Sequence, residues 1–345
     1  MESNRIAVKF VKVRVYMNKK TKWRLYENRW KFREFYFHKA LRRHICEKYL
    51  NFDPVMHFYA NQFIMGKKKT NRWIADKINS KEPFMVARFG NTELSVMTSV
   101  LKRRLFGNSP GTQARFDEWF TRMGEGAGFF PVVPELGDKF TDLMLDSCKE
   151  VDVLAMWHCH MDDYVITEYM PDVKLSYLNY IEPWRCKEPW SAALKGKKVL
   201  LIHPFEDSIK EQYARRELLF PGTDVLPEFE LKTLKAVQTI AGEKDERFET
   251  WFEALEYMYG QALQIDFDIA IIGCGAYGFP LAAKLKAAGK QVIHMGGVTQ
   301  ILFGIKGLRW VENPRAQIKF NDAWVYPKES ETPQNCKVVE RGCYW

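Results

Sequence analysis

Polar side chains follow four apolar segments of the sequence, each at the point where a buried strand is expected to end. The groups are Arg88–Glu93, His158–Asp163, His203–Asp207, and a glycine-rich turn paired with His294–Gly297. The carboxyl ends of parallel strands meet at one edge of an open α/β sheet, where such sheets bind their ligands. We therefore expect these groups to line one ligand site.

The glycine-rich turn lies in FDIAIIGCGAYGFPLAAKLKAAGKQVIHMGG. Gly273, Gly275 and Gly278 have the spacing G-x-G-x-x-G between an apolar strand and a helix, and Tyr277 lies among them. Backbone N–H groups and a helix N-terminus at such a turn can hold a phosphate. Alternatively, the glycines only allow a tight turn and close packing of the helix on the strand.

The second strand of this unit ends in His294, Met295, Gly296 and Gly297. A dinucleotide-binding fold needs an acidic residue at this point to hold the ribose, and none is present. His294, on the buried strand, could donate to a phosphate or serve as a base, or it could be only structural. The two glycines allow close approach of the backbone to a ligand.

The segment RFGNTE follows the apolar run FMVA. Asn91 and Glu93 could direct two oxygens at a hard cation such as Mg²⁺ or Mn²⁺, which shares its ligands with phosphates. Arg88 could pair with a diphosphate. Alternatively, Asn91 caps the helix that follows and Arg88 bonds Glu93.

Histidines mark the other two groups. The H-x-H spacing of His158 and His160 puts both rings on one face, which suits zinc, although no further ligands stand at a known spacing and a polar sheet edge is the alternative. His203 could act as a base or donate to a phosphate, or it could be a loop residue held by Asp207. Glu206 is the second candidate for a base.

Helical patterns alternate with apolar strands along the body of the chain. This alternation predicts an α/β fold of the Rossmann-like kind, with a mostly parallel sheet and helices on both faces. The expected strands are 84–87, 151–157, 196–202, 225–231, 267–272 and 291–295, and the expected helices are 73–79, 94–101, 116–123, 136–148, 207–219 and 248–264.

Charge divides the chain into three parts: a basic, aromatic, helical arm (1–80), a Rossmann-like domain (81–325) and an irregular tail (326–345). The net charge is +9, and the first 69 residues hold 18 Lys and Arg against 5 Asp and Glu. Aromatic residues spaced by three or four between residues 23 and 44 indicate an amphipathic helix. It could dock on the body or on a second subunit, contact an anionic membrane through residues 1–70, or bind nucleic acid. Since the domain itself is not basic, no nucleic-acid partner is expected.

The seven cysteines form no C-x-x-C pair, which favours reduced thiols in the cytoplasm. The first residues lack the apolar core of a secretory signal, and no run is long enough to span a membrane. We expect a cytoplasmic protein, peripheral at the inner face of the membrane.

RFGNTE resembles the RFGDGE-type segment of bacterial glycosyltransferases with the GT-D fold. Residues 196–220 and 267–310, the latter ending in HMGGVTQILFGIKGLRW, are similar to polysaccharide-biosynthesis relatives of that group, as is the terminal GCYW. The resemblance covers 84–325 and the last residues. It implies a transferase that moves a sugar from a nucleotide-sugar, expected to be UDP-linked, to a surface or capsular polysaccharide or a lipid-linked glycan.

The resemblance also implies roles for single residues. In the family, an Asp-x-Glu pair of the first motif binds a divalent metal and the donor diphosphate. Glu93 matches the Glu, Asn91 stands where the Asp would be, and Arg88 and Gly90 match as they are. A neutral amide is a poorer ligand than a carboxylate, so the use of Mn²⁺ or Mg²⁺ stays open.

Two other functions compete with the transferase. One is an NAD-dependent sugar-nucleotide dehydrogenase or epimerase, which would need the missing ribose-binding acid. The other is a non-catalytic partner in glycan assembly that has lost its metal site. In the transferase, Arg88, Asn91 and Glu93 would contact the donor diphosphate, the two glycine segments would line the nucleotide or sugar, and His203 or Glu206 would be the base.

Overall fold

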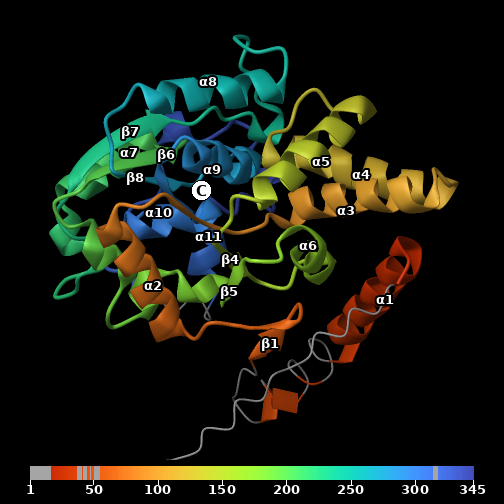
Figure 1. The fold of residues 1–345 in the computed structure, drawn as a ribbon. Coiled ribbons are helices and arrows are strands. Elements are labelled where there is room, and N and C mark those ends of the chain that lie inside the picture. The colour runs from red at the N-terminus through yellow and green to blue at the C-terminus, as the bar shows by residue number, and fades with distance from the viewer. Residues whose placement is uncertain (1–16, 37–40, 42–44, 47, 50–54, 314–317) are drawn as a thin grey trace, which may run out of the picture. The chain divides into compact units, whose positions relative to one another are not determined.

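A computed structural model describes residues 17–36, 41, 45–46, 48–49, 55–313 and 318–345 (Figure 1). The chain divides into two compact units, Met1–Asp53 and Pro54–Trp345. In the first unit, helix α1 (Lys19–Phe32) begins where the Asn18 side chain accepts a hydrogen bond of 2.9 Å from the backbone N–H of Thr21.

Helix α1 buries Trp23 and Tyr26, so the aromatic spacing does mark a helix. The rest of the predicted helix, up to residue 44, falls partly outside the described residues. Among the helices that the structure describes, none combines the length and apolar character that crossing a membrane requires. The membrane contact of residues 1–70 stays a prediction.

Seven parallel strands of the second unit form one sheet in the order β5-β4-β3-β9-β8-β6-β7. This arrangement confirms the predicted α/β class. A short antiparallel hairpin, β1 (Phe58–Tyr59) and β2 (Gln62–Phe63), lies outside the sheet. The sheet strands are β3 (Phe84–Ala87), β4 (Val153–Met156), β5 (Lys174–Tyr177), β6 (Lys198–His203), β7 (Glu230–Lys235), β8 (Ile269–Ile272) and β9 (Gln291–His294).

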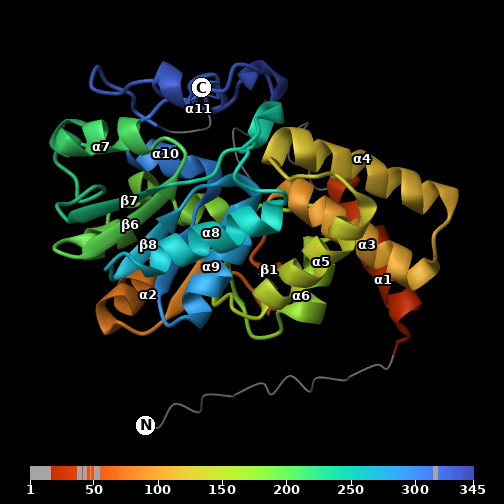
Figure 2. The same ribbon diagram turned by 90° about the horizontal axis from the view of Figure 1, so that it is seen from above.

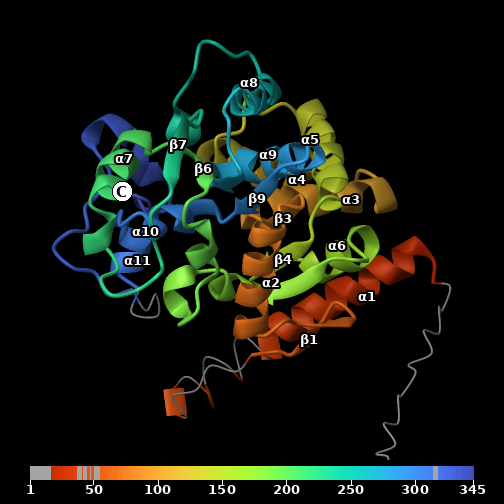
Figure 3. The same ribbon diagram turned by 60° about the vertical axis from the view of Figure 1, so that its left-hand side comes forward.

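Helices cover both faces of the sheet (Figures 1 and 3). On one face lie α5 (Pro134–Cys148), α8 (Trp251–Leu263) and α9 (Gly278–Ala287), and α3 (Asn91–Phe106) packs against α5 and carries α4 (Pro110–Ala127). The other face packs against α2 (Lys67–Ser80), α7 (Glu206–Ala214) and α10 (Thr299–Leu302). The remaining helices are α6 (Asp162–Tyr169) and α11 (Leu308–Val311).

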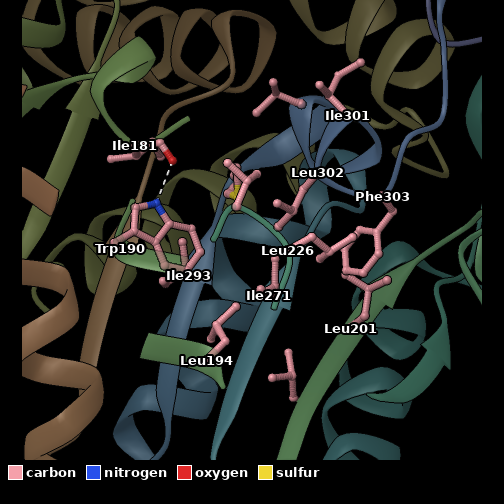
Figure 4. Packing of buried hydrophobic residues seen from close by; sticks show 14 of the residues in the cluster. Ile181, Trp190, Leu194, Leu201, Leu226, Ile271, Ile293, Ile301, Leu302 and Phe303 are labelled. Atoms are coloured by element: carbon pink, nitrogen blue, oxygen red, sulfur yellow. Dashed lines mark hydrogen bonds between the residues drawn. The ribbon is translucent and has the colours of Figure 1, made fainter. Parts of the chain in front are cut away.

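On the face covered by α2, α7 and α10, the core consists of aliphatic and aromatic side chains from strands and helices (Figure 4). Ile271 and Ile293 of the sheet are fully buried beneath Leu302. Trp190 is also fully buried, and its indole N–H donates a hydrogen bond of 2.8 Å to the carbonyl of Ile181. Burying each such side chain contributes about 1.5–3 kcal/mol, so this cluster anchors the strands whose ends form the site.

The two edge strands of the sheet, β5 and β7, differ from the strands expected from the sequence. The strand predicted at 225–231 is wrong: β7 runs from Glu230 to Lys235, while Val225 and Leu226 are buried without strand structure. Pro227 lacks the N–H that a ladder needs, which explains the later start. Strand β5 and helix α6 were not predicted.

Both ends of the second unit belong to its packed structure. Ile74 and Ile78 of α2 are fully buried in the core, so the compact unit begins before residue 81. The tail from residue 326 forms only short 3₁₀ turns among its described residues, as its irregular sequence suggests. Val339 and Cys343 are nevertheless buried.

Candidate functional site

A cavity of about 240 Å³ lies at the carboxyl edge of the sheet. The chain leaves β3 toward α3 and leaves β9 toward α10, so the two loops diverge to opposite faces, which is the usual setting of a ligand crevice in open α/β sheets. Residues at or after the ends of six strands line the cavity: Arg88, Trp157, His203, Val237, Gly273 and Gly296.

Three of the four polar groups predicted from the sequence border this cavity. Arg88–Glu93, the glycine turn with Gly296 and Gly297, and His203 contribute lining residues. The fourth group, His158–Asp163, does not line it. The Arg115 guanidinium donates to His160 Nε2 over 2.9 Å, which occupies the lone pair that zinc would need.

Arg88 presents its guanidinium to the cavity. Its Nε is buried and has no hydrogen-bond partner among the residues that the structure describes. The guanidinium carbon lies 5.4 Å from the centroid of the Trp157 ring, and the indole N–H of Trp157 is fixed by a 2.9 Å bond to the Phe89 carbonyl. Trp157 is 42% exposed. A buried cationic donor without an acceptor is suited to an anionic ligand.

Glu93 lies in the first turn of α3, with its carboxylate folded over Gly90. A Cβ on Gly90 would lie 1.9 Å from Glu93 Oε2, so a side chain at this position would displace the Glu93 carboxylate. Burial raises the pKa of Glu93, and the nearby Arg88 charge partly offsets this effect.

Asn91 is the first residue of α3 and is exposed. The alternative in which Asn91 caps this helix is wrong, because Gly90 is the N-cap and the helix start has no side-chain cap hydrogen bond among the described residues. Asn91 and Glu93 both line the cavity.

Within the described part of the chain, no three His, Cys, Asp or Glu residues gather closely enough to hold a metal ion. A divalent cation at the Asn91–Glu93 pair would have a single carboxylate from this motif. Phosphate oxygens of a bound ligand would have to complete its coordination, as is common for Mg²⁺.

Some residues of the glycine turn line the cavity, and Gly278 packs against the protein. Gly273, Gly275 and Tyr277 line the cavity, and Gly275 has the left-handed φ of +57° that favours glycine. Gly278 instead makes room for a side chain, because a Cβ there would lie 2.2 Å from His294 Cε1. For Gly278, the packing alternative is therefore the one that the structure supports.

Tyr277 is held on both sides. Its ring stacks on Trp251 with centroids 4.8 Å apart, and its hydroxyl is 3.2 Å from Thr239 Oγ1. Burial raises the pKa of the Tyr277 hydroxyl, and the hydrogen bond with Thr239 partly offsets this effect. Tyr277 therefore forms a rigid wall of the cavity.

His294 lies beneath the site and does not line the cavity. Burial lowers its pKa to about 3, and its Nδ1 is 3.3 Å from the Ile272 carbonyl. After this strand, Gly296 and Gly297 do line the cavity, and a Cβ on Gly297 would lie 2.4 Å from the Tyr344 ring.

His203 lines the cavity but does not have the geometry of a base. The Phe205 backbone N–H donates to His203 Nδ1 over 3.0 Å, and burial lowers the pKa of His203 to about 3. The neutral ring then carries its proton on Nε2 and can only donate there. Asp207 does not hold the ring as expected: among the described residues, the hydrogen bond to the His203 ring comes from Phe205 and none comes from Asp207.

Glu206 lies outside the cavity lining. Its carboxylate accepts hydrogen bonds from Lys210, at 2.8 Å, and from the Thr233 hydroxyl. These bonds direct it toward β7.

Several lining residues were not predicted. They come from segments far apart in the sequence: Trp157, Thr239, Gln300, Arg309, Glu340, Tyr344 and Trp345. Arg309 donates to the Tyr344 hydroxyl over 3.2 Å and forms an ion pair with Glu340. For Tyr344 and Trp345, the sequence feature that could have indicated a role in the site is the terminal GCYW, which carries part of the family resemblance.

No protein-family model matches the chain, and no curated protein matches it either. A solved structure described with the words "The highly conserved domain of unknown function 1792 has a distinct glycosyltransferase fold" is similar to it, with 13% identity and a TM-score of 0.39 over 69% of this chain and 79% of that chain. A selenomethionine-substituted structure of the domain of unknown function 1792 has 12% identity and a TM-score of 0.36, covering 68% of this chain and 78% of that chain. Likenesses of this degree establish neither family membership nor an activity.

Proposed function

We propose that the protein is a glycosyltransferase that takes a sugar from a nucleotide-sugar, expected to be UDP-linked, and transfers it to a glycan or lipid-linked acceptor. The observation that carries the proposal is the buried, unpartnered Nε of Arg88 in the crevice at the carboxyl ends of the strands. A diphosphate supplies the acceptors that this guanidinium lacks. The half-exposed Trp157 beside it offers an aromatic surface for a base or a sugar.

Glycosyl transfer needs stabilisation of the diphosphate that leaves with the nucleotide. Arg88 would bind its negative charge, and the neutral His203 would donate from Nε2. Glu93 and Asn91 would hold a divalent cation there, and the cation would supply positive charge that neutralises the phosphates.

Glu93 is also the candidate to accept the proton of the acceptor hydroxyl. Among the described residues, Glu93 and Glu340 bring side-chain carboxylates to the cavity lining, and Glu340 is engaged with Arg309. The raised pKa of Glu93 suits a general base.

The test is a thermal-shift panel of UDP, UDP-sugars, GDP- and CMP-sugars and NAD, each with and without Mn²⁺. We expect stabilisation by one nucleotide-sugar, about 2.7 kcal/mol when the ligand is at about 100 times its dissociation constant. Arg88→Met should weaken that binding at least about tenfold, because a hydrogen bond to a charged group contributes about 1.5–3 kcal/mol. Release of free nucleotide in the presence of acceptor would then demonstrate transfer.

Arg103→Met is the matched control. Arg103 is also largely buried, but it is paired with Asp138 over 2.7 Å and does not line the cavity. The loss of Arg103 should lower stability and leave the ligand shift intact, whereas Arg88→Met should reduce the ligand shift to about half or less without lowering stability. A shift with NAD alone would favour an oxidoreductase, and no shift with any ligand would favour the non-catalytic partner.

A further inference from the structure

Gln300 is a buried amide whose orientation the protein dictates. It is 1% exposed and lines the cavity. Its Nε2 donates to the carbonyls of Lys306, Tyr344 and Ile305 at 2.9, 3.0 and 3.4 Å. Because carbonyl oxygens only accept, the nitrogen must lie on that side and Oε1 on the other.

That oxygen is left without a partner. Oε1 of Gln300 is buried and accepts no hydrogen bond from any residue that the structure describes. An unpaired buried acceptor is costly, and in folded proteins such atoms call for a particular explanation. Since Gln300 borders the cavity, a hydrogen-bond donor on a ligand is the explanation that its position supports.

Gln212 shows what a purely structural glutamine looks like in the same fold. It is also 1% exposed, and its Nε2 donates to the carbonyls of Gly304 and Ala323 at 2.9 and 3.0 Å. Its Oε1 accepts from Arg215 Nε over 2.6 Å, and it does not line the cavity. The two amides thus differ in two respects: the side-chain oxygen of Gln300 is unpaired among the described residues, and Gln300 borders the cavity.

We propose that Gln300 is a specificity-determining residue of the donor site, whose Oε1 accepts a hydrogen bond from the base or from the transferred sugar of the nucleotide-sugar, and not from its ribose. The imide N–H of a uracil base and a hydroxyl of the sugar are the two sources of that chemistry. A carbonyl oxygen repels phosphate, so Gln300 and Arg88 select opposite parts of one ligand. This inference rests on the proposed function.

The test measures binding of UDP, UDP-glucose and N3-methyl-UDP by titration calorimetry to the whole protein and to two variants. Gln300→Met should weaken the recognised ligand about tenfold, the value of one hydrogen bond. Gln212→Met, which loses a comparable set of carbonyl contacts, should stay within about twofold of the unchanged protein. Calorimetric unfolding of both variants reports their structural cost separately.

The ligand series identifies the source without any variant. If Oε1 accepts from the base, the unchanged protein should bind N3-methyl-UDP about tenfold more weakly than UDP, and Gln300→Met should bind both equally. If it accepts from the sugar, the preference for UDP-glucose over UDP should disappear in Gln300→Met.

Either pattern supports the inference. Equal effects of Gln300→Met on all three ligands, or none, would overturn it while leaving the proposed function intact. Failure of the unchanged protein to bind UDP or UDP-glucose would overturn the UDP-linked donor itself, and the inference with it.

Discussion

Glu93 is an acidic residue that the fold keeps away from water beside a cationic one. Its carboxylate lies over Gly90, and burial raises its pKa despite the Arg88 charge. The folded protein therefore keeps the Glu93 proton at a pH where the unfolded chain, with the ordinary glutamate pKa of 4.5, has lost it. The Glu93 contribution to stability is full below this ordinary value and is lost as the pH rises through the raised pKa.

Glu93→Gln should consequently gain stability over the unchanged protein as the pH rises, and the gain should level off above the raised pKa. We expect a final difference of about 1–3 kcal/mol, the usual cost of burying a polar group with incomplete compensation. Urea denaturation from about pH 4 to about pH 8 measures it. The exposed Glu329→Gln serves as control, and a Glu93→Gln difference that does not vary with pH would contradict the prediction.

At the residue scale, the sequence identified the motif residues that border the cavity but not all of their roles. Arg88 and Glu93 were recognisable because one short segment carries both. The role of Gly278 was not, since glycine spacing does not tell whether a Cβ would meet a ligand or the His294 ring. Gln300 carries no local signal, because its partners lie at Lys306 and Tyr344.

At the scale of elements, α9 packs closely on β9 because Gly278 has no side chain. Gly278→Ala would put a Cβ 2.2 Å from the buried ring of His294. We expect a loss of about 1–3 kcal/mol, the usual cost of overpacking a core. Chemical denaturation measures this loss. In a His294→Ala background, where the ring is absent, the added Gly278→Ala change should cost less than it does in the unchanged protein.

Gly260→Ala is the matched control in α8. A Cβ there meets nothing within 4 Å, so the change should stabilise the protein by about 0.5–1 kcal/mol through the unfolded chain. Equal effects of the Gly260 and Gly278 changes would show that the His294 contact does not matter.

Elements were predictable where burial is complete. Strands β3 and β8 are buried at every position, and their unbroken apolar sequences FMVA and IAII predict buried strands. Strands β5 and β7 at the sheet edges are partly exposed, so KLSY and ELKTLK contain polar residues and look like loops. The apolar run around Val225 was misleading because core residues need not lie in strands.

At the scale of the compact unit, the last residues lie beside α7 and α11 (Figure 2). The buried carboxylate of Glu331 accepts from the backbone N–H groups of Asp207 and Ser208 at 2.8 and 3.3 Å, at the start of α7. A carboxylate at a helix N-terminus also interacts favourably with the helix dipole.

Glu331→Ala should therefore lower the free energy of unfolding by about 1–3 kcal/mol, since it leaves these N–H groups unpaired. Thermal denaturation measures the loss, and limited proteolysis should cut the tail faster than in the unchanged protein. The neighbouring Glu329→Ala is the control, because Glu329 is exposed. A melting temperature equal to that of the control would contradict this role of Glu331.

The position of the last two residues has a practical consequence for handling the protein. Tyr344 and Trp345 line the cavity, and the indole N–H of Trp345 donates to the Glu331 carbonyl over 3.3 Å. Any affinity tag, fluorescent reporter or fusion partner joined after Trp345 would start at the binding site and compete with ligands for space.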